Sequence, residues 1–210
     1  MTSTDTAASG QGATDGGYDK ADGAENVLVL AGSMDGTSEY CAERLDSPPG
    51  TAPPSALFVS LDDSPDRRLE AVIGGRAAHP TNVGVVCCDE TRGAAAAGPT
   101  GGAGAGPDLT PGPWVATVGS PGDLTGLGVR IEEVLSAWAD GPGSLELCFH
   151  SLTTLCQYTD DRTVFRFCHA VTRHLAAVGA SSHFHLDPGA VDERTVATLS
   201  ALFDRVEDRT

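Results

Sequence analysis

The chain has 210 residues, of which 29 are acidic and 13 basic, and its formal net charge is −16. This length suits one sizeable domain with room for tails. The acidic excess argues against a nucleic-acid duplex or a bare acidic lipid surface as ligand, because both need Lys and Arg to contact phosphate groups.

Residues 25–207 are expected to fold, and two segments of low complexity lie one before this part of the chain and one within it. Residues 1–24 are rich in Gly, Ser, Thr, Ala and Asp and hold almost no large apolar side chain. Such a segment cannot bury enough surface to offset its ordering entropy, so it predicts a disordered tail. Residues 93–113 are rich in Gly, Ala and Pro and predict a long flexible loop, with an insertion favoured over a binding role.

Short apolar runs alternate with helical patterns along the rest of the chain. The runs of strand length are 27–31, 56–61, 83–87, 114–118, 145–149 and 180–185. The helical patterns follow at 37–45, 64–73, 124–139, 160–178 and 192–206. In the last of these, apolar residues recur at helical spacing as far as Val206.

This alternation predicts an α/β fold with a doubly wound, mostly parallel sheet and helices on both faces. Ligands of such sheets bind outside the carboxyl ends of the strands. Carboxylates precede the last two helical patterns at Asp160 and Asp192, where they complement a helix dipole, and residues 187–189 predict a turn.

The first apolar run leads into a Gly-containing turn and a helix start, the context in which a P-loop binds phosphate. On the pattern G-x-x-x-x-G-K-[ST], Ala31 stands at the first Gly and Gly36 at the second. Thr37 stands at the Lys and Ser38 at the metal-binding hydroxyl. Losing the Lys and adding Asp35 weakens triphosphate binding, since one charge at 4 Å is worth about 4 kcal/mol at an effective dielectric of 20. The alternative is that Gly36 and Thr37 only end a strand and cap a helix.

Two further apolar runs end in polar residues of interest. Residues 58–61 lead into the acidic pair Asp62 and Asp63, and residues 145–149 lead into His150, Ser151 and Leu152. The first resembles the strand and acidic pair of RecA/RadA/KaiC-type ATPases, with Asp in place of the usual Glu. The second is similar to the Walker B strand of that family, with His150 in place of the Asp that supports hydrated Mg²⁺.

The resemblance to RecA-like P-loop ATPases extends over residues 25–207. Segments 117–128 and 181–188 look like those of a haloarchaeal group of small RecA-like proteins with degenerate Walker A and Walker B motifs. The resemblance implies a RecA-like core. The nucleotide-binding positions that it implies are Gly32, Ser33, Gly36, Thr37, Ser38, Asp62, Asp63 and His150.

The departures at Ala31, Thr37 and His150 affect the phosphate side and the metal side of the site together. They favour a non-hydrolysing regulatory or protein-interaction module, in a signalling or gene-regulation pathway, with no catalytic residue assigned. A nucleotide sensor that binds weakly at the degenerate P-loop is the alternative, and a metal-dependent enzyme is a third. No cofactor beyond weakly bound nucleotide is expected.

The RecA-type strand order would bring His150, His185 and Asp187 towards one crevice. A His/His/Asp set could hold a transition metal such as Zn²⁺. The competing interpretation is that imidazoles at strand ends satisfy neighbouring polar groups, and it is favoured. The six cysteines contain no CxxC pair, so buried reduced thiols are expected.

The charged residues also indicate a compartment. Lys20 is the only lysine, and Asp outnumbers Glu, as in proteins of halophilic archaea whose carboxylate surface keeps them solvated in concentrated salt. An acidic protein of an ordinary high-GC organism is the alternative. The polar N-terminus and the absence of an apolar run long enough to span a bilayer predict a cytoplasmic protein. The interaction-module hypothesis implies a protein partner of unknown identity, and a homo-oligomer is left open.

Overall fold

The structure is a computed structural model that describes residues 24–32, 37–74, 79–88, 113–150 and 152–210. The strands over these residues are β1 (Asn26–Leu30), β2 (Ser55–Ser60), β3 (Val83–Cys88), β4 (Trp114–Val118), β5 (Leu145–Phe149), β6 (Ser181–Leu186) and β7 (Arg205–Asp208). The helices are α1 (Thr37–Arg44), α2 (Pro65–Ile73), α3 (Leu124–Trp138), α4 (Leu152–Tyr158), α5 (Asp161–Val178) and α6 (Glu193–Ser200).

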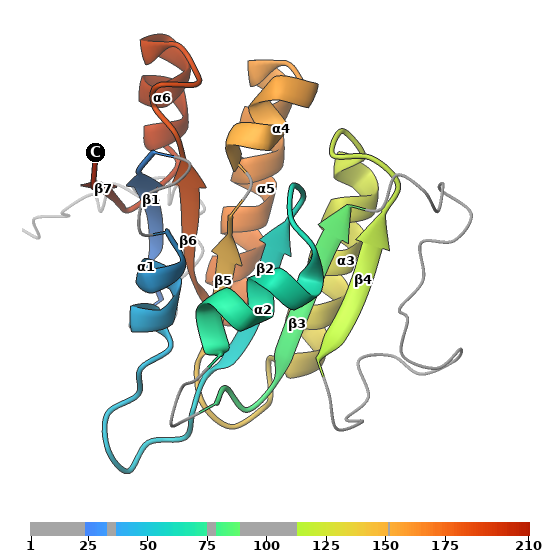
Figure 1. The fold of residues 1–210 in the computed structure, drawn as a ribbon, viewed down its shortest axis with the longest axis vertical. Helices are drawn as coiled ribbons and strands as arrows, with labels where there is room; N and C mark the ends of the chain where they lie inside the picture. The colour runs from blue at the N-terminus through green and yellow to red at the C-terminus, as the bar shows by residue number, and fades with distance from the viewer. Residues whose placement is uncertain (1–23, 33–36, 75–78, 89–112, 151) are drawn as a thin grey trace, which may run out of the picture.

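The described strands form one parallel sheet in the order β4-β3-β2-β5-β6-β1-β7 (Figure 1). The α/β class and the parallel sheet are confirmed, and β1 to β6 each lie within one residue of their predicted bounds. The order also places β6 between β1 and β5, as expected from the sequence. The carboxyl ends of β1, β5 and β6 therefore lie side by side.

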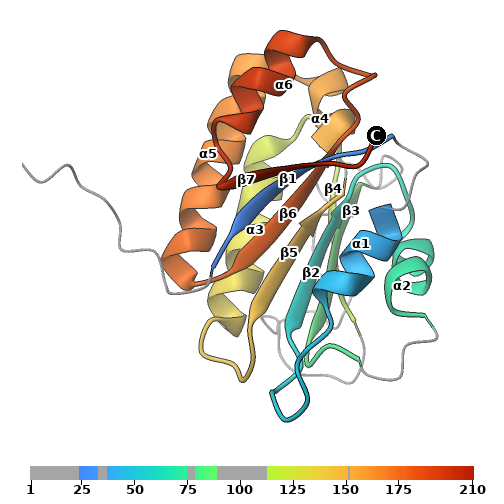
Figure 2. The same ribbon diagram turned by 90° about the vertical axis from the view of Figure 1, so that its left-hand side faces the viewer.

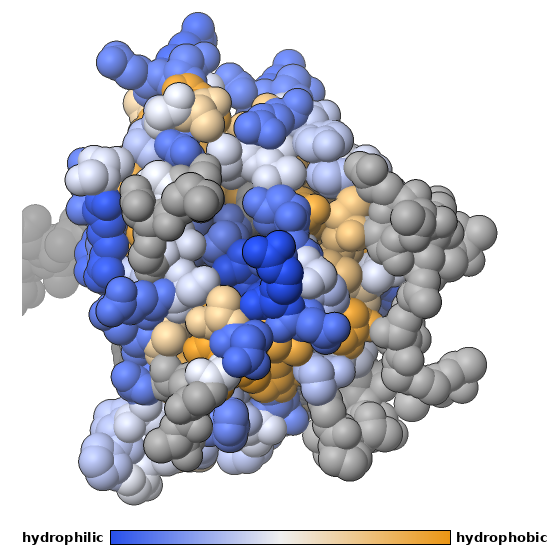
Figure 3. All heavy atoms as spheres, in the orientation of Figure 1, coloured by the Kyte–Doolittle hydropathy of each residue, from blue (hydrophilic) through white to orange (hydrophobic). Residues whose placement is uncertain are grey.

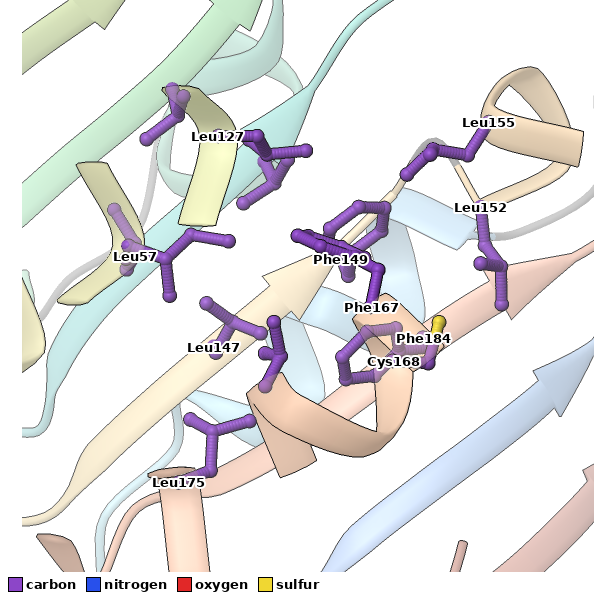
Figure 4. Packing of buried hydrophobic residues seen from close by; sticks show 14 of the residues in the cluster. Leu57, Leu127, Leu147, Phe149, Leu152, Leu155, Phe167, Cys168, Leu175 and Phe184 are labelled. Atoms are coloured by element: carbon purple, nitrogen blue, oxygen red, sulfur yellow. The ribbon is translucent and has the colours of Figure 1, made fainter. Parts of the chain in front are cut away.

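Helices cover both faces of the sheet, with α1 and α2 on one side and α3, α4, α5 and α6 on the other (Figure 2). The larger hydrophobic core lies under the second group (Figure 4). At its centre the rings of Phe149 and Phe184 stack at 4.9 Å, and Phe167 meets Phe149 edge-on at 6.0 Å. This double coverage explains why the strands are nearly continuous apolar runs.

The α1 and α2 face has a smaller apolar core and a more polar interior. Phe58, Val72 and Val85 form part of its hydrophobic cluster, together with the thiols of Cys41 and Cys148. Seen from outside, hydrophilic side chains gather at the centre of this face, with apolar patches beside them (Figure 3). Alternate residues of β5 and β6 point to this face, and several of them are polar, so the face can house a site.

The carboxylates predicted to complement helix dipoles are N-caps. The side chain of Asp160 accepts from the N–H of Thr163, and that of Asp192 from the N–H of Thr195. The predicted turn at 187–189 is also present, since Asp187 accepts a hydrogen bond from the N–H of Gly189 at 2.9 Å. These local signals act over three residues or fewer, which is why they can be read from sequence.

The prediction of one helix over 192–206 is wrong. Helix α6 ends at Ser200, and Arg205–Asp208 forms β7 along the edge of β1. Backbone pairing decides this, because the exposed edge of β1 offers unpaired N–H and C=O groups that a longer helix would leave without partners. Phe203 helps the chain to turn by packing edge-on against Phe184 at 5.1 Å.

Helix α4 was not predicted. It has seven residues, too few for an apolar repeat to stand out, and two of them are β-branched Thr. Leu152 and Leu155 fix it to the sheet, since both side chains are fully buried. Tertiary packing therefore stabilises this helix more than its own sequence does.

Gly179 ends α5 with a φ of 71°, in the left-handed region that favours glycine. Gly179→Ala is expected to lower the free energy of unfolding by about 1–2 kcal/mol, measured by chemical denaturation. Gly128→Ala is the matched control. Gly128 lies inside α3, and a Cβ added there makes only an ordinary contact of 3.9 Å with Phe167 of α5. This control should raise stability by about 0.5–1 kcal/mol, and equal losses in both variants would contradict the interpretation.

The predicted tail, 1–24, and the predicted flexible loop, 93–113, lie outside the described residues except for their terminal positions Ala24 and Pro113. Of the helices that are described, none is both long enough and apolar enough to cross a membrane.

Candidate functional site

The predicted phosphate loop joins β1 to α1. Gly32 lies two residues after the end of β1, and Thr37 and Ser38 open α1. Ser33 and Gly36 lie outside the described residues. What the structure does describe is the helix start that follows it and the residues that face this start.

His150 faces the start of α1 from the end of β5. Its Nε2 lies 2.8 Å from Oγ1 of Thr37, and its backbone N–H donates to the carbonyl of Val59 at 2.9 Å. Two positions that the resemblance assigns to the phosphate side and the metal side are thus in direct contact. A hydrogen bond between neutral groups joins them where a P-loop ATPase would have charged ones.

Arg68 of α2 reaches into the same place, although only 4% of the residue is exposed. Its NH2 lies 2.9 Å from Nδ1 of His150, and its NH1 donates to Oγ of Ser38 at 3.3 Å. Its Nε donates to Oγ of Ser60 at 3.4 Å, and Asp63 lies 3.7 Å away. We call Arg68 and these partners, together with Thr37, the Arg68 network.

The protonation of His150 follows from this network. Burial, and then the positive charge of Arg68, lower the pKa of His150 to about 4, so the ring is neutral at neutral pH. A guanidinium can only donate, so Nδ1 of His150 accepts. The ring proton is then on Nε2, which donates to Oγ1 of Thr37.

The acidic pair after β2 divides between two environments. Asp63 forms ion pairs with Arg67 at 3.5 Å and Arg68 at 3.7 Å. Asp62 is exposed, and Thr154 donates to it at 3.4 Å. Of the pair, only Asp62 lines the pocket at the carboxyl ends of β1, β5 and β6.

This pocket has a volume of about 360 Å³ and lies at the carboxyl ends of β1, β5 and β6. Thr37, Asp62, His150, His185 and Asp187 all contribute to its lining. The expected gathering of the two histidines and Asp187 is thus present. As a metal site the trio is poor, because both ring nitrogens of His150 already have protein partners.

A second group of polar side chains lies deeper on the same face. Cys41 of α1, Cys148 of β5, and His183 and His185 of β6 place their Sγ or ring nitrogen atoms within 4.8 Å of one another, and all four residues are buried. We call these residues the Cys/His cluster. The Sγ of Cys41 lies 3.2 Å from Nε2 of His183 and 3.4 Å from Nε2 of His185.

Glu146 holds the cluster from the amino end of β5. Its Oε1 lies 2.8 Å from Nδ1 of His183, and Nε of Arg44 donates to the same carboxylate at 3.1 Å. Burial by itself lowers the pKa of His183, but Cys41 and then Glu146 outweigh it and raise that pKa to about 9. The interior of this face is therefore charged as well as polar.

The two thiols of the cluster differ in acidity. Burial raises the pKa of Cys41, but a hydrogen bond from Cys148 and the imidazoles of His183 and His185 bring it well below its ordinary value. Burial and the hydrogen bond to Cys41 raise the pKa of Cys148 well above its ordinary value. Cys41 is therefore the more acidic thiol of the pair.

A family model matches residues 24–207, and it is described as a family of unknown function, DUF7504. The chain belongs to the DUF7504 family. No curated protein matches the chain. The DUF7504 match takes in the whole Arg68 network and the whole Cys/His cluster.

Sequence reasoning missed Arg68, Cys41 and Cys148 as site residues. Arg68 precedes the buried Val72 by four residues and so shares the inner face of α2, but it is the packing of this helix on the sheet that fixes which face is the inner one. His183 and His185 are two residues apart in the predicted strand 180–185, so the sequence places them on one face of it. What could not be read was that α1 covers this face and adds Cys41 to it.

Proposed function

We propose that this chain is a RecA-like pseudo-ATPase, a module that works through regulation or protein contacts and does not hydrolyse nucleotide. One observation carries the proposal. The guanidinium of Arg68 is bonded both to Ser38, at the metal-binding hydroxyl position, and to His150, at the Walker B position. A fixed cation of the chain itself thus stands between the two groups that would support Mg²⁺.

The positive charge of Arg68 disfavours the metal ion that phosphoryl transfer requires. A divalent ion 4 Å from a guanidinium is repelled by about 8 kcal/mol at an effective dielectric of 20. His150 is neutral and donates to Thr37, so it offers no anionic support to a hydrated metal ion. Asp63, the nearest carboxylate to Arg68, is engaged by two arginines.

The strand order supports the RecA-like part of the proposal. In the RecA-type sheet one strand separates the P-loop strand from the Walker B strand, and β6 stands in that place between β1 and β5. The composition supports the cytoplasm of a halophilic archaeon as the setting, with a net charge of −16 and a single lysine.

The test is an ATPase assay of the full chain in molar KCl with Mg²⁺. We expect phosphate release no faster than in buffer, for ATP and for GTP, from wild type and from Gly36→Asp alike. Turnover by the wild type that Gly36→Asp abolishes would overturn the proposal, since Gly36 aligns with the second glycine of the P-loop.

A second candidate function is nucleotide sensing without hydrolysis. The pocket at the strand ends favours it, because its volume of about 360 Å³ is at the lower end of the range for small-ligand sites and Thr37 lines it. Asp62 and Asp187 in the same lining disfavour several phosphates, so a mononucleotide fits better than a triphosphate.

Thermal shift in molar KCl separates the two candidates. A sensor should melt at a higher temperature with millimolar AMP, and Asp187→Asn should change this shift. An unchanged melting temperature with millimolar AMP, ADP, ATP and GTP would exclude the sensor and leave the scaffold.

A further inference from the structure

The Cys/His cluster combines the two side-chain types that bind zinc most often in proteins. Thiolate sulfur and imidazole nitrogen are its ligands in closed structural sites, where four of them surround the ion as a tetrahedron. Here two of each kind converge, and none belongs to an exposed residue. We propose that Cys41, Cys148, His183 and His185 form a binding site for one Zn²⁺ ion.

The spacing of the four atoms fits this geometry. Zn–S bonds of about 2.3 Å and Zn–N bonds of about 2.0–2.1 Å place tetrahedral ligands roughly 3.3–3.8 Å apart. The two S···N distances from Cys41 are 3.2 and 3.4 Å, and all four atoms lie within 4.8 Å of one another. Shifts of a few tenths of an ångström to about 1 Å would close the tetrahedron.

Backbone register brings three of the ligands together. His183 and His185 are two apart on β6 and so share one face, and Cys148 of β5 is the direct cross-strand partner of His183. Cys41 approaches from α1, which covers this face (Figure 2). Strands of a sheet are rigid supports, so three ligands stand on rigid elements and the helix supplies the fourth.

Glu146 and Arg44 supply the outer support that metal-binding histidines usually have. A ligating His generally donates its other ring N–H to a carboxylate, which fixes the tautomer and the ring orientation. Nδ1 of His183 lies 2.8 Å from Glu146, which leaves Nε2 directed at Cys41 and the cluster. Arg44 in turn holds Glu146 at 3.1 Å.

The charge balance of binding is simple. Zn²⁺ displaces two protons, that of the Cys148 thiol and the one that Cys41 and His183 share across their contact of 3.2 Å. Two thiolates and two neutral imidazoles then surround the ion, and the site itself has no net charge. The attraction between Glu146 and the N–H of His183 persists in the bound form.

The alternative interpretation of the cluster is the active site of a cysteine hydrolase. Cys41, His183 and Glu146 would then be the nucleophile, the base and the orienting carboxylate. Burial argues against it. Cys41 and His183 are both 0% exposed, so a substrate has no approach to the sulfur. This reading also leaves Cys148 and His185 without a role, whereas a metal site uses all four.

The ion would fasten α1 to the sheet. Helix α1 has eight residues and buries only Tyr40 and Cys41 among them, a small apolar anchor for a helix that begins at the candidate phosphate loop. A bond from Cys41 to an ion held by β5 and β6 would fix this helix. The role is structural and does not depend on whether nucleotide binds.

The test uses the full chain without a histidine tag, purified in molar KCl under reducing conditions. Elemental analysis should find about one zinc per chain, and a strong chelator should lower the melting temperature by about 10 °C. Cys41→Ser and His185→Gln should each reduce bound zinc by about tenfold or more. Cys168→Ser is the matched control, since Cys168 is also fully buried but lies in the opposite core, and it should keep its zinc.

Because a ligand variant can fail to fold, the wild-type apoprotein provides an independent readout. Titration with Co²⁺ should produce a thiolate-to-cobalt charge-transfer band and the d–d bands of tetrahedral cobalt, saturating at one equivalent. Wild-type protein without zinc that also develops no such bands would overturn the proposal. A Cys41–Cys148 disulfide in freshly isolated protein, or equal zinc loss in Cys168→Ser, would overturn it as well.

Discussion

Arg68→Ala is expected to lower the free energy of unfolding by about 3–5 kcal/mol, measured by urea denaturation in molar KCl. The substitution removes a buried cation and leaves Nδ1 of His150, the hydroxyls of Ser38 and Ser60 and the carboxylate of Asp63 without their common partner. Salt should not mask the effect, because the guanidinium is shielded from solvent ions by burial.

Arg67→Ala is the matched control for this prediction. Arg67 is the preceding residue of the same helix and also pairs with Asp63, but its side chain is 82% exposed. Its loss should cost less than about 0.5 kcal/mol, as for most surface ion pairs. Similar losses in the two variants would show that Arg68 acts only as a surface charge of α2.

Under the proposed pseudo-ATPase function, the Arg68 network matters for more than stability. A buried cation is costly unless several groups satisfy it, and here those groups are the ones that a RecA-like ATPase would use for its metal ion. Under this proposal, stability and ATP hydrolysis therefore oppose one another at this site. A variant without Arg68 would lose stability while still lacking the phosphate-binding lysine, so it should not gain ATPase activity.

The sheet could be predicted from sequence because each of its central strands is buried on both faces. Runs such as residues 145–149 contain four large or polarisable apolar side chains among five residues, so their bounds are sharp. The edge strand β7 could not be found this way. Its residues are charged except for Val206, and only the open edge of β1 makes them a strand.

The site was predictable in part. His150, Thr37 and Asp62 were identified from positions in a motif, and the strand order then brings them together. Arg68 and Cys41 depend on which face of a helix meets the sheet, which depends on the tertiary packing of α1 and α2. A helix of eight or nine residues carries too few apolar positions to fix that face from sequence alone.

The polar interior under α1 and α2 sets this domain apart from an ordinary doubly wound fold. On one side of the sheet the core is aromatic and aliphatic, and on the other a chain of polar groups runs from Glu146 to Arg68. The rings of His150 and His185 are 5.3 Å apart, so the Cys/His cluster adjoins the Arg68 network. A substitution in the Cys/His cluster is therefore expected to affect the Arg68 network, and the reverse.

Glu146→Ala is expected to destabilise the fold by about 3–5 kcal/mol, measured by the same denaturation assay. The carboxylate is 6% exposed and has two partners, Nε of Arg44 at 3.1 Å and Nδ1 of His183 at 2.8 Å. Truncation leaves both of these buried or half-buried groups without an anion and opens a void under α1. Glu146→Gln should cost less, since an amide oxygen still accepts from one partner while the charge is lost.

Glu133→Ala is the control, because Glu133 also pairs with an arginine, Arg130 at 2.8 Å, but with a side chain that is 45% exposed on α3. Its loss should change the free energy of unfolding by less than about 0.5 kcal/mol. If Glu146→Ala were as mild, the carboxylate would not be holding His183 and Arg44 in place. The support that it gives to the Cys/His cluster would then have to come from the strands alone, and His183 would be free to choose its tautomer.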